Sequence, residues 1–115
     1  MVQAYKKLFW TEHSKIKMKQ YRLSKQKLLS ILYKPDRKEQ GIVPGTIAVM
    51  RTNKSYSNIL KKKNKVSGEI WIMYKNTKDF KKIISAWRYP GISKPGDKIP
   101  IPEDILQELL NQINK

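Results

Sequence analysis

The sequence contains no cysteine, and this absence excludes disulfide bonds and thiolate metal sites. It also contains no apolar run that approaches the ~20 residues of a membrane-spanning helix. The N-terminus has lysines but no apolar stretch of the kind that forms the core of a signal peptide. We therefore expect a cytoplasmic protein that makes no contact with a membrane.

Acidic side chains are scarce: nine Asp and Glu stand against 25 Lys and Arg, which gives the 115-residue chain a net charge of +16. A codon bias toward lysine explains part of this excess. A domain with so much like charge repels itself, so a polyanionic partner is the more natural explanation. Three of the acidic residues, Glu103, Asp104 and Glu108, lie near the C-terminus, which leaves the surplus on residues 1–101. We expect this basic body to bind nucleic acid; the alternatives are a membrane surface and a bias of composition alone.

The length suits one compact domain, and we treat residues 1–115 as a single unit. Periodic patterns predict helices over 12–22, 24–34 and about 102–113, and strands over 46–52, 68–76 and 80–89 with a turn at 76–79. Residues 3–9 are a further candidate strand, and 36–45 is expected to be a loop. The sequence thus predicts an α+β fold: two N-terminal helices packed on an antiparallel sheet of three to four strands, plus a C-terminal helix. That last helix either packs on the sheet or docks another chain.

Histidine is nearly absent, and the single copy, His13, lies in the lysine-rich stretch TEHSKIKMKQYRLS, residues 11–24. An imidazole titrates near neutral pH, so His13 is a candidate general acid or base. Neighbouring lysines favour its neutral, basic form. The alternative is a local hydrogen bond or a contact with backbone phosphate. One imidazole cannot be both acid and base in one turnover, so Tyr74, Tyr89 or a lysine would have to complete a catalytic pair.

Arginine is rare beside lysine, with only four copies in the chain: Arg22, Arg37, Arg51 and Arg88. Its planar fork binds phosphate through two parallel hydrogen bonds, which lysine cannot do. Arg51 and Arg88 fall at the ends of predicted strands, and we expect them to contact phosphate in a catalytic site. The alternative is an arginine on the solvent side of a strand end. Arg37 falls in the predicted loop and is expected to be solvated.

Further residues are candidates for RNA binding outside the catalytic set. The lysine run Lys61, Lys62, Lys63 and Lys65, together with Lys17 and Arg22, would contact the backbone, which fixes affinity without reading sequence. Trp87 and Tyr89 are a candidate stacking platform for a base. The alternatives are a solvated lysine loop and a tryptophan that belongs to the core.

Residues 13–24 read H-S-K-I-K-M-K-Q-Y-R-L-S, which resembles the opening H-A-x-x-R-M-x-x-R-G-I-S of short proteins in the RelE-like toxin group. His13, Met18 and Ser24 match this pattern, while Ser14, Lys17 and Leu23 are conservative replacements. Tyr21–Arg22 stands where the pattern has Arg–Gly. Later segments, EIWIMYK and KKIISAWRYPG, look like the final hairpin of that group. The resemblance covers about residues 10–91.

The resemblance implies a barnase–EndoU–colicin–RelE type of fold, in which helices pack on one face of an antiparallel sheet and RNA lies across the other. It also implies a metal-independent endoribonuclease, the toxin of a toxin–antitoxin pair. Its partners would be RNA, including ribosome-bound mRNA, and an acidic antitoxin protein.

Two other readings of the same sequence remain open. One is a non-enzymatic nucleic-acid- or ribosome-binding accessory protein of phage or mobile-element origin. The other is a phage protein that binds the acidic surface of a host protein. In every reading we expect no cofactor and no metal, since the chain offers no evident cluster of carboxylate or imidazole ligands.

Overall fold

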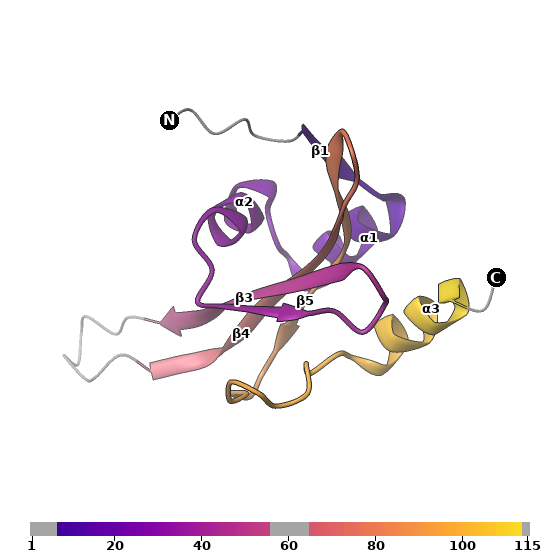
Figure 1. Cartoon of the computed structure of the whole chain (residues 1–115). Coiled ribbons are helices and arrows are strands. Elements are labelled where there is room, and N and C mark those ends of the chain that lie inside the picture. Colours follow the sequence, from indigo (N-terminus) through magenta and orange to yellow (C-terminus); the bar gives the residue numbers. More distant parts are fainter. Residues whose placement is uncertain (1–6, 56–64, 114–115) are drawn as a thin grey trace.

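The computed structural model describes residues 7–55 and 65–113. Figure 1 shows an α+β arrangement of helices around one twisted sheet. In chain order the elements are β1 (Lys7–Trp10), α1 (Glu12–Tyr21), α2 (Lys25–Tyr33), β2 (Arg37–Gln40), β3 (Thr46–Ser55), β4 (Lys65–Asn76), β5 (Phe80–Tyr89) and α3 (Glu103–Ile113). The turn predicted at 76–79 does connect β4 to β5, with the amide of Thr77 donating to the carbonyl of Phe80 over 2.8 Å.

The sheet has five strands in the order β1-β5-β4-β3-β2. It is mixed, because β1 pairs in parallel with β5 while all other neighbours pair antiparallel. The predicted count of three to four antiparallel strands was therefore wrong. The prediction missed β2, whose sequence RKEQ lies in the segment expected to be a loop. A fully polar strand at the sheet edge lacks the apolar alternation by which a half-buried strand is recognised.

Polar caps set the bounds of the first two helices. The side chain of Thr11 accepts a hydrogen bond from the amide of Ser14, and Ser24 does the same for Lys27. Such N-caps satisfy backbone donors that have no partner inside the helix. Arg22, with a φ of 55°, ends α1 in the left-handed conformation. The helices are slightly shorter than the predicted ranges 12–22 and 24–34 because the cap residues stand outside them.

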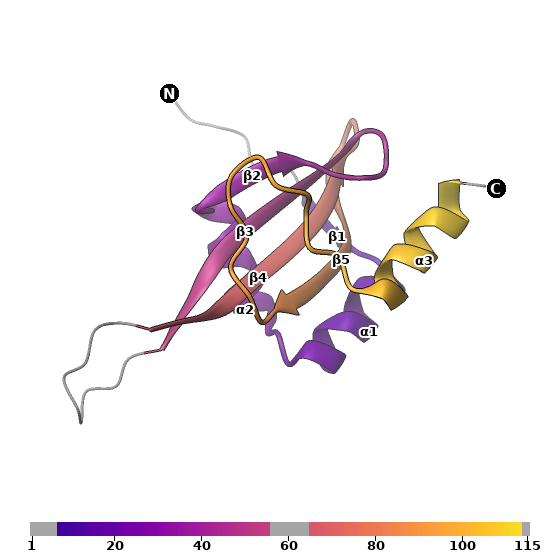
Figure 2. The ribbon, with the colours of Figure 1, turned by 90° about the horizontal axis from the view of Figure 1, so that it is seen from below.

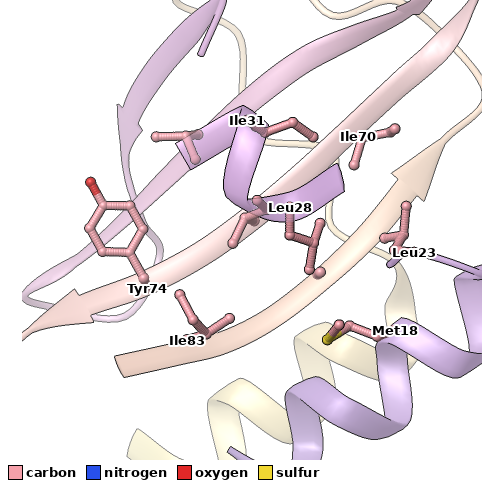
Figure 3. Packing of buried hydrophobic residues seen from close by; sticks show 10 residues of the cluster. Met18, Leu23, Leu28, Ile31, Ile70, Tyr74 and Ile83 are labelled. Atoms are coloured by element: carbon pink, nitrogen blue, oxygen red, sulfur yellow. The ribbon is translucent and has the colours of Figure 1, made fainter. Parts of the chain in front are cut away.

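One face of the sheet, which we call the α2 face, is covered by α2 and by the C-terminal half of α1. Figure 3 shows aliphatic side chains of the helices meeting those of β4 and β5 there. The buried cluster consists of Met18, Leu23, Leu28, Ile31, Val49, Ile70, Ile72, Tyr74, Ile83 and Ala86. Two residues of α2, Leu28 and Ile31, are completely buried in it. Apolar packing therefore closes this face.

The opposite face, the α3 face, is covered by α3 and by residues 90–101. Figure 2 shows this segment crossing the sheet before the chain enters α3. The buried cluster consists of Ala48, Met50, Trp71, Met73, Ile84, Trp87, Ile105 and Leu109. Trp71 and Trp87 stack with ring centroids 6.3 Å apart and planes inclined by 7°. The resemblance leaves this face open to RNA, but here a large part of it is occupied by the protein's own chain.

Candidate functional site

His13 joins three elements at the edge of the α3 face. It stands in the first turn of α1, and its side chain is 19% exposed. Its Nδ1 contacts a carboxylate oxygen of Glu108 in α3, and its Nε2 lies 3.1 Å from the hydroxyl of Ser85 in β5. Both ring nitrogens therefore have a protein partner, which fixes the plane of the ring.

Lys17, one helical turn after His13, makes the second link between α1 and α3. It is 5% exposed, and its Nζ donates to Asp104 over 2.5 Å and lies 3.7 Å from Glu108. His13 and Lys17 are four residues apart on α1, as are Asp104 and Glu108 on α3, so each pair lies on one side of its helix. Two cationic groups thus meet two carboxylates across the helix–helix contact. The RNA contact predicted for Lys17 is not available to an ammonium group buried in this way.

The charge states at this contact follow from burial and from the opposing charges. Burial lowers the pKa of His13 below 6.5, and Lys17 adds to this effect, while Glu108 and Asp104 oppose it. The pKa of Lys17 is raised, since its hydrogen bond to Asp104 and the nearby carboxylates outweigh the effect of burial. That same hydrogen bond lowers the pKa of Asp104. At neutral pH the structure therefore favours a neutral imidazole beside a charged lysine–aspartate pair.

A cavity of about 340 Å³ opens beside His13. Its lining combines the N-terminal end of α1 with the ends of three strands and consists of Thr11, His13, Val43, Thr46, Lys75, Lys82 and Ile84. Lys75 and Lys82 lie directly opposite each other on β4 and β5. The residues next to them, Tyr74 and Ile83, point into the α2-face cluster, so both lysines project on the α3 face.

The two lysines that line the cavity have no acidic partner in the part of the chain that the structure describes. Within the described residues, neither Lys75 nor Lys82 takes part in an ion pair. Like charges directly opposite each other in a sheet are destabilising. A bound anion would remove this repulsion. The hydroxyl groups of Thr11 and Thr46 on the same wall donate to the carbonyls of Ile83 and Val43, so the two lysines supply the positive charge of the cavity. The cavity therefore has the chemistry of an anion site.

Ser85, His13 and Glu108 follow one another in the order of a serine–histidine–carboxylate triad. Ser85, however, is completely buried and does not line the cavity. A hydroxyl that no substrate can reach does not act as a nucleophile. In this structure Ser85 is a hydrogen-bond partner of the imidazole.

The structure does not bring Arg51 and Arg88 to His13. Arg88 donates to the carbonyls of Tyr21 and Arg22 over 2.7 and 3.2 Å, at the end of α1. Arg51 donates to the carbonyls of Ser30 and Lys34 over 3.0 and 2.6 Å, at the end of α2. The carbonyls of Tyr21, Arg22 and Lys34 lie at helix ends, where backbone acceptors need partners from outside the helix, whereas the carbonyl of Ser30 also accepts from the amide of Lys34. Both arginines hold helices on the α2 face.

Tyr74 and Trp87 are also placed away from the cavity. Tyr74 is 4% exposed in the α2-face cluster, where burial raises the pKa of its hydroxyl. Trp87 is completely buried, and its indole donates to the carbonyl of Pro100 over 2.8 Å. Trp87 belongs to the buried cluster of the α3 face, and Tyr89 is partly buried against that cluster. The buried Trp87 offers no ring face to an incoming base.

The remaining predicted RNA contacts divide into three cases. The side chain of Arg22 is exposed and borders an open hollow between α1 and α2 together with Lys15, Lys19 and Lys25. Lys61, Lys62 and Lys63 lie outside the described residues. Lys65 begins β4, and its side chain is likewise outside what the structure describes.

Arg37 was expected to be solvated in a loop, and this was wrong. It stands in β2, where its guanidinium binds Glu39 and donates to the hydroxyl of Ser93 over 2.6 Å. Ser93 in turn binds the buried carboxylate of Glu69, whose oxygens lie 2.8 and 3.0 Å from the serine hydroxyl. This chain of contacts holds residues 90–101 on the α3 face.

Sequence reasoning missed Lys75, Lys82, Ser85 and Glu108. For the two lysines a signal existed, because strands joined by the predicted turn at 76–79 place residues near 75 and 82 opposite each other. For Glu108 none existed, since its contact with His13 depends on how α3 docks.

Comparisons with models of protein families, with curated proteins and with solved structures found no significant match to this chain. Among the described helices, none is both long and apolar enough to cross a membrane. In residues 7–55 and 65–113, no three histidine, aspartate or glutamate side chains gather closely enough to hold a metal ion.

Proposed function

We propose that this chain is an RNA-binding protein of the RelE-like type, and that a backbone phosphate of the RNA occupies the cavity beside His13. The observation that carries the proposal is the pairing of Lys75 with Lys82 across β4 and β5, without an acidic partner in the described residues. This arrangement costs stability in the free protein and favours binding of a polyanion. The net charge of +16 supports the same conclusion. The RelE-like assignment rests on the pattern of residues 13–24 and on the α+β fold.

The cavity is also large enough for this role. Its volume of about 340 Å³ lies at the lower end of the range typical of small-ligand sites. A phosphate with part of its ribose fits such a space, whereas the lysines at its wall supply charge but no base recognition. We therefore expect affinity for RNA of any sequence at this site.

The test compares Lys75→Gln and Lys82→Gln with Lys38→Gln, which removes an exposed lysine from β2 at the far edge of the sheet. Binding of a short single-stranded RNA is measured over a range of salt concentrations. Each cavity variant should lower the slope of log affinity against log salt by about 0.7, the value for one phosphate contact. The control should leave the slope nearly unchanged.

The same variants should change the stability of the free protein in the opposite direction to their RNA affinity. Because removal of either lysine relieves a like-charge pair, each cavity variant should stabilise the free protein by up to about 1 kcal/mol. Weaker binding together with higher stability is the signature of a residue kept for its ligand. RNA affinity and salt slope equal to those of the Lys38→Gln control would overturn the proposal.

A second candidate function is metal-independent cleavage of that RNA, as expected of an endoribonuclease toxin. It is favoured because His13, the only histidine, lines the same cavity as the two lysines. Its neutral imidazole would take the proton of a 2′-hydroxyl, and the lysines would stabilise the charge that builds on the phosphate. Because Tyr74 is buried on the other face, a lysine of the cavity would protonate the leaving oxygen.

Cleavage is tested with free RNA and with ribosome-bound mRNA in the presence of EDTA. His13→Gln should lower the rate at least about a hundredfold, the lower range for a general acid–base group, with RNA affinity retained. If the wild-type chain binds both substrates and cuts neither, the non-enzymatic accessory protein is the function that remains. An acidic antitoxin stays a prediction of the RelE-like assignment.

A further inference from the structure

The carboxylate of Glu108 belongs to α3, yet it contacts the ring nitrogen of His13 that faces away from β5. A carboxylate accepts hydrogen bonds and donates none when ionised. The nitrogen in contact with it must therefore carry a proton. In the neutral imidazole only one nitrogen is protonated, so a proton on Nδ1 leaves Nε2 with its lone pair.

The contact at Nε2 is consistent with this assignment. The hydroxyl of Ser85 lies 3.1 Å from Nε2 and is able to donate to it. A hydroxyl oxygen at this distance from an imidazole lone pair has the geometry that a general base needs toward a substrate hydroxyl. Ser85 is buried, whereas His13 is partly exposed and lines the cavity, so a substrate hydroxyl in the cavity has to take the place of Ser85 at Nε2.

We propose that Glu108 is a positioning residue for His13: it holds the proton on Nδ1 and so keeps Nε2 as a proton acceptor, to which the hydroxyl of Ser85 donates in the protein without RNA. The contact also fixes the ring, because α3 is anchored independently of charge by Ile105 and Leu109, which are 0% and 1% exposed. This inference rests on the proposed function for the use of Nε2. The tautomer itself is a property of the protein without RNA.

The chain offers an unusually direct test, because it has a single histidine and its imidazole signals need no assignment by mutation. Long-range ¹H–¹⁵N correlation spectra of the full chain without RNA report which ring nitrogen is protonated. We expect the Nδ1-protonated tautomer to predominate in the wild type above the pKa of His13. Ser85→Ala should leave this tautomer in place.

Two variants of Glu108 separate its hydrogen bond from its charge. Glu108→Ala removes the acceptor, so the tautomer should shift toward a proton on Nε2. Glu108→Gln keeps a carbonyl acceptor but removes the charge, so the tautomer should persist while the pKa of His13 falls further. Glu103→Gln is the matched control, since it removes the same charge from an exposed position of α3, where the carboxylate accepts a hydrogen bond from Gln107.

The amide signals of Ile105 and Leu109 show whether α3 stays docked in each variant. If α3 leaves the sheet in Glu108→Ala, the inference is still tested by Glu108→Gln, in which the pKa of His13 should fall. An Nε2-protonated wild type, or a Glu108→Gln variant that titrates like Glu103→Gln, would overturn the inference. Neither result bears on whether Lys75 and Lys82 bind phosphate, so the two proposals fail separately.

Discussion

The two faces of the sheet are closed by different means. On the α2 face, aliphatic side chains from α1 and α2 pack on the strands, and the arginines there bind helix carbonyls. On the α3 face, buried tryptophans are joined by polar and charged contacts: Glu69 with Ser93, Lys17 with Asp104, and His13 with Glu108. The cavity with its two facing lysines lies at the edge of this second face.

This contrast indicates that the two faces of the sheet have different roles. Apolar packing is the cheaper way to stabilise a small domain, whereas buried charges carry a desolvation cost that their partners must offset. Charges and partly exposed polar groups are found where the α3 face meets the cavity. We infer that the α2 face mainly supplies stability and that the α3 face also serves ligand binding.

The largest expected effect tests the α2 face. Leu28 is completely buried in α2, and Leu28→Ala should lower the free energy of unfolding by about 2–5 kcal/mol. Its neighbour Leu29 is 42% exposed, so Leu29→Ala should change the stability by about 0.5 kcal/mol or less. Both are measured by denaturant unfolding. Under conditions where Leu28→Ala remains folded, its RNA affinity should equal that of the wild type. A weaker affinity would contradict the inference that the α2 face supplies stability and takes no part in ligand binding.

A smaller effect is expected at the two arginines that bind helix ends. Lysine cannot reproduce the paired contacts of Arg88 or Arg51, so Arg88→Lys and Arg51→Lys should each cost about 1–2 kcal/mol. Arg22→Lys serves as the stability control because that side chain is exposed. The sequence-based hypothesis, in which both arginines contact phosphate, predicts the reverse: little loss of stability and a lower salt slope of RNA binding.

The parts of the fold that follow from local rules could be predicted. The caps at Thr11 and Ser24 and the turn between β4 and β5 depend on residues close in sequence, and each could be anticipated from them. The strand β2 could not, because RKEQ becomes a strand only by pairing with β3. The number of strands in the sheet is therefore set by tertiary contacts, and local sequence patterns do not reveal it.

Of the residues in the candidate site, the sequence analysis predicted only the rarest, His13. His13 attracts attention as the single histidine, whereas Lys75 and Lys82 are two lysines among many and gain meaning only from their pairing in the sheet. Arg51 and Arg88 attract attention by rarity too, but they bind helix ends. Rarity indicates that a side chain has a specific role, and the structure is needed to say which role.

The smallest expected effect is a dependence of stability on pH that originates at the edge of the α3 face. The pKa of His13 lies below 6.5 in the folded protein and near 6.5 in the unfolded chain. Between these values the unfolded chain binds more protons, so stability rises with pH. The contribution of His13 is thus complete above about pH 6.5 and is lost as the pH falls toward its folded pKa.

Few other groups titrate in that window. The α-amino group titrates near pH 8 and ordinary carboxylates near pH 4. The charged groups that face His13 are Lys17, Asp104 and Glu108, with Lys75 and Lys82 on the cavity wall. The pKa of Asp104 is lowered and that of Lys17 is raised, so neither of these two changes its charge between pH 7 and pH 5. Unfolding measured from pH 7 to pH 5 should therefore show a decline in the wild type and a nearly flat profile in His13→Gln. An equal decline in both proteins would show that burial does not lower the pKa of His13. In that case the imidazole would not link the charged contacts of the α3 face to the cavity.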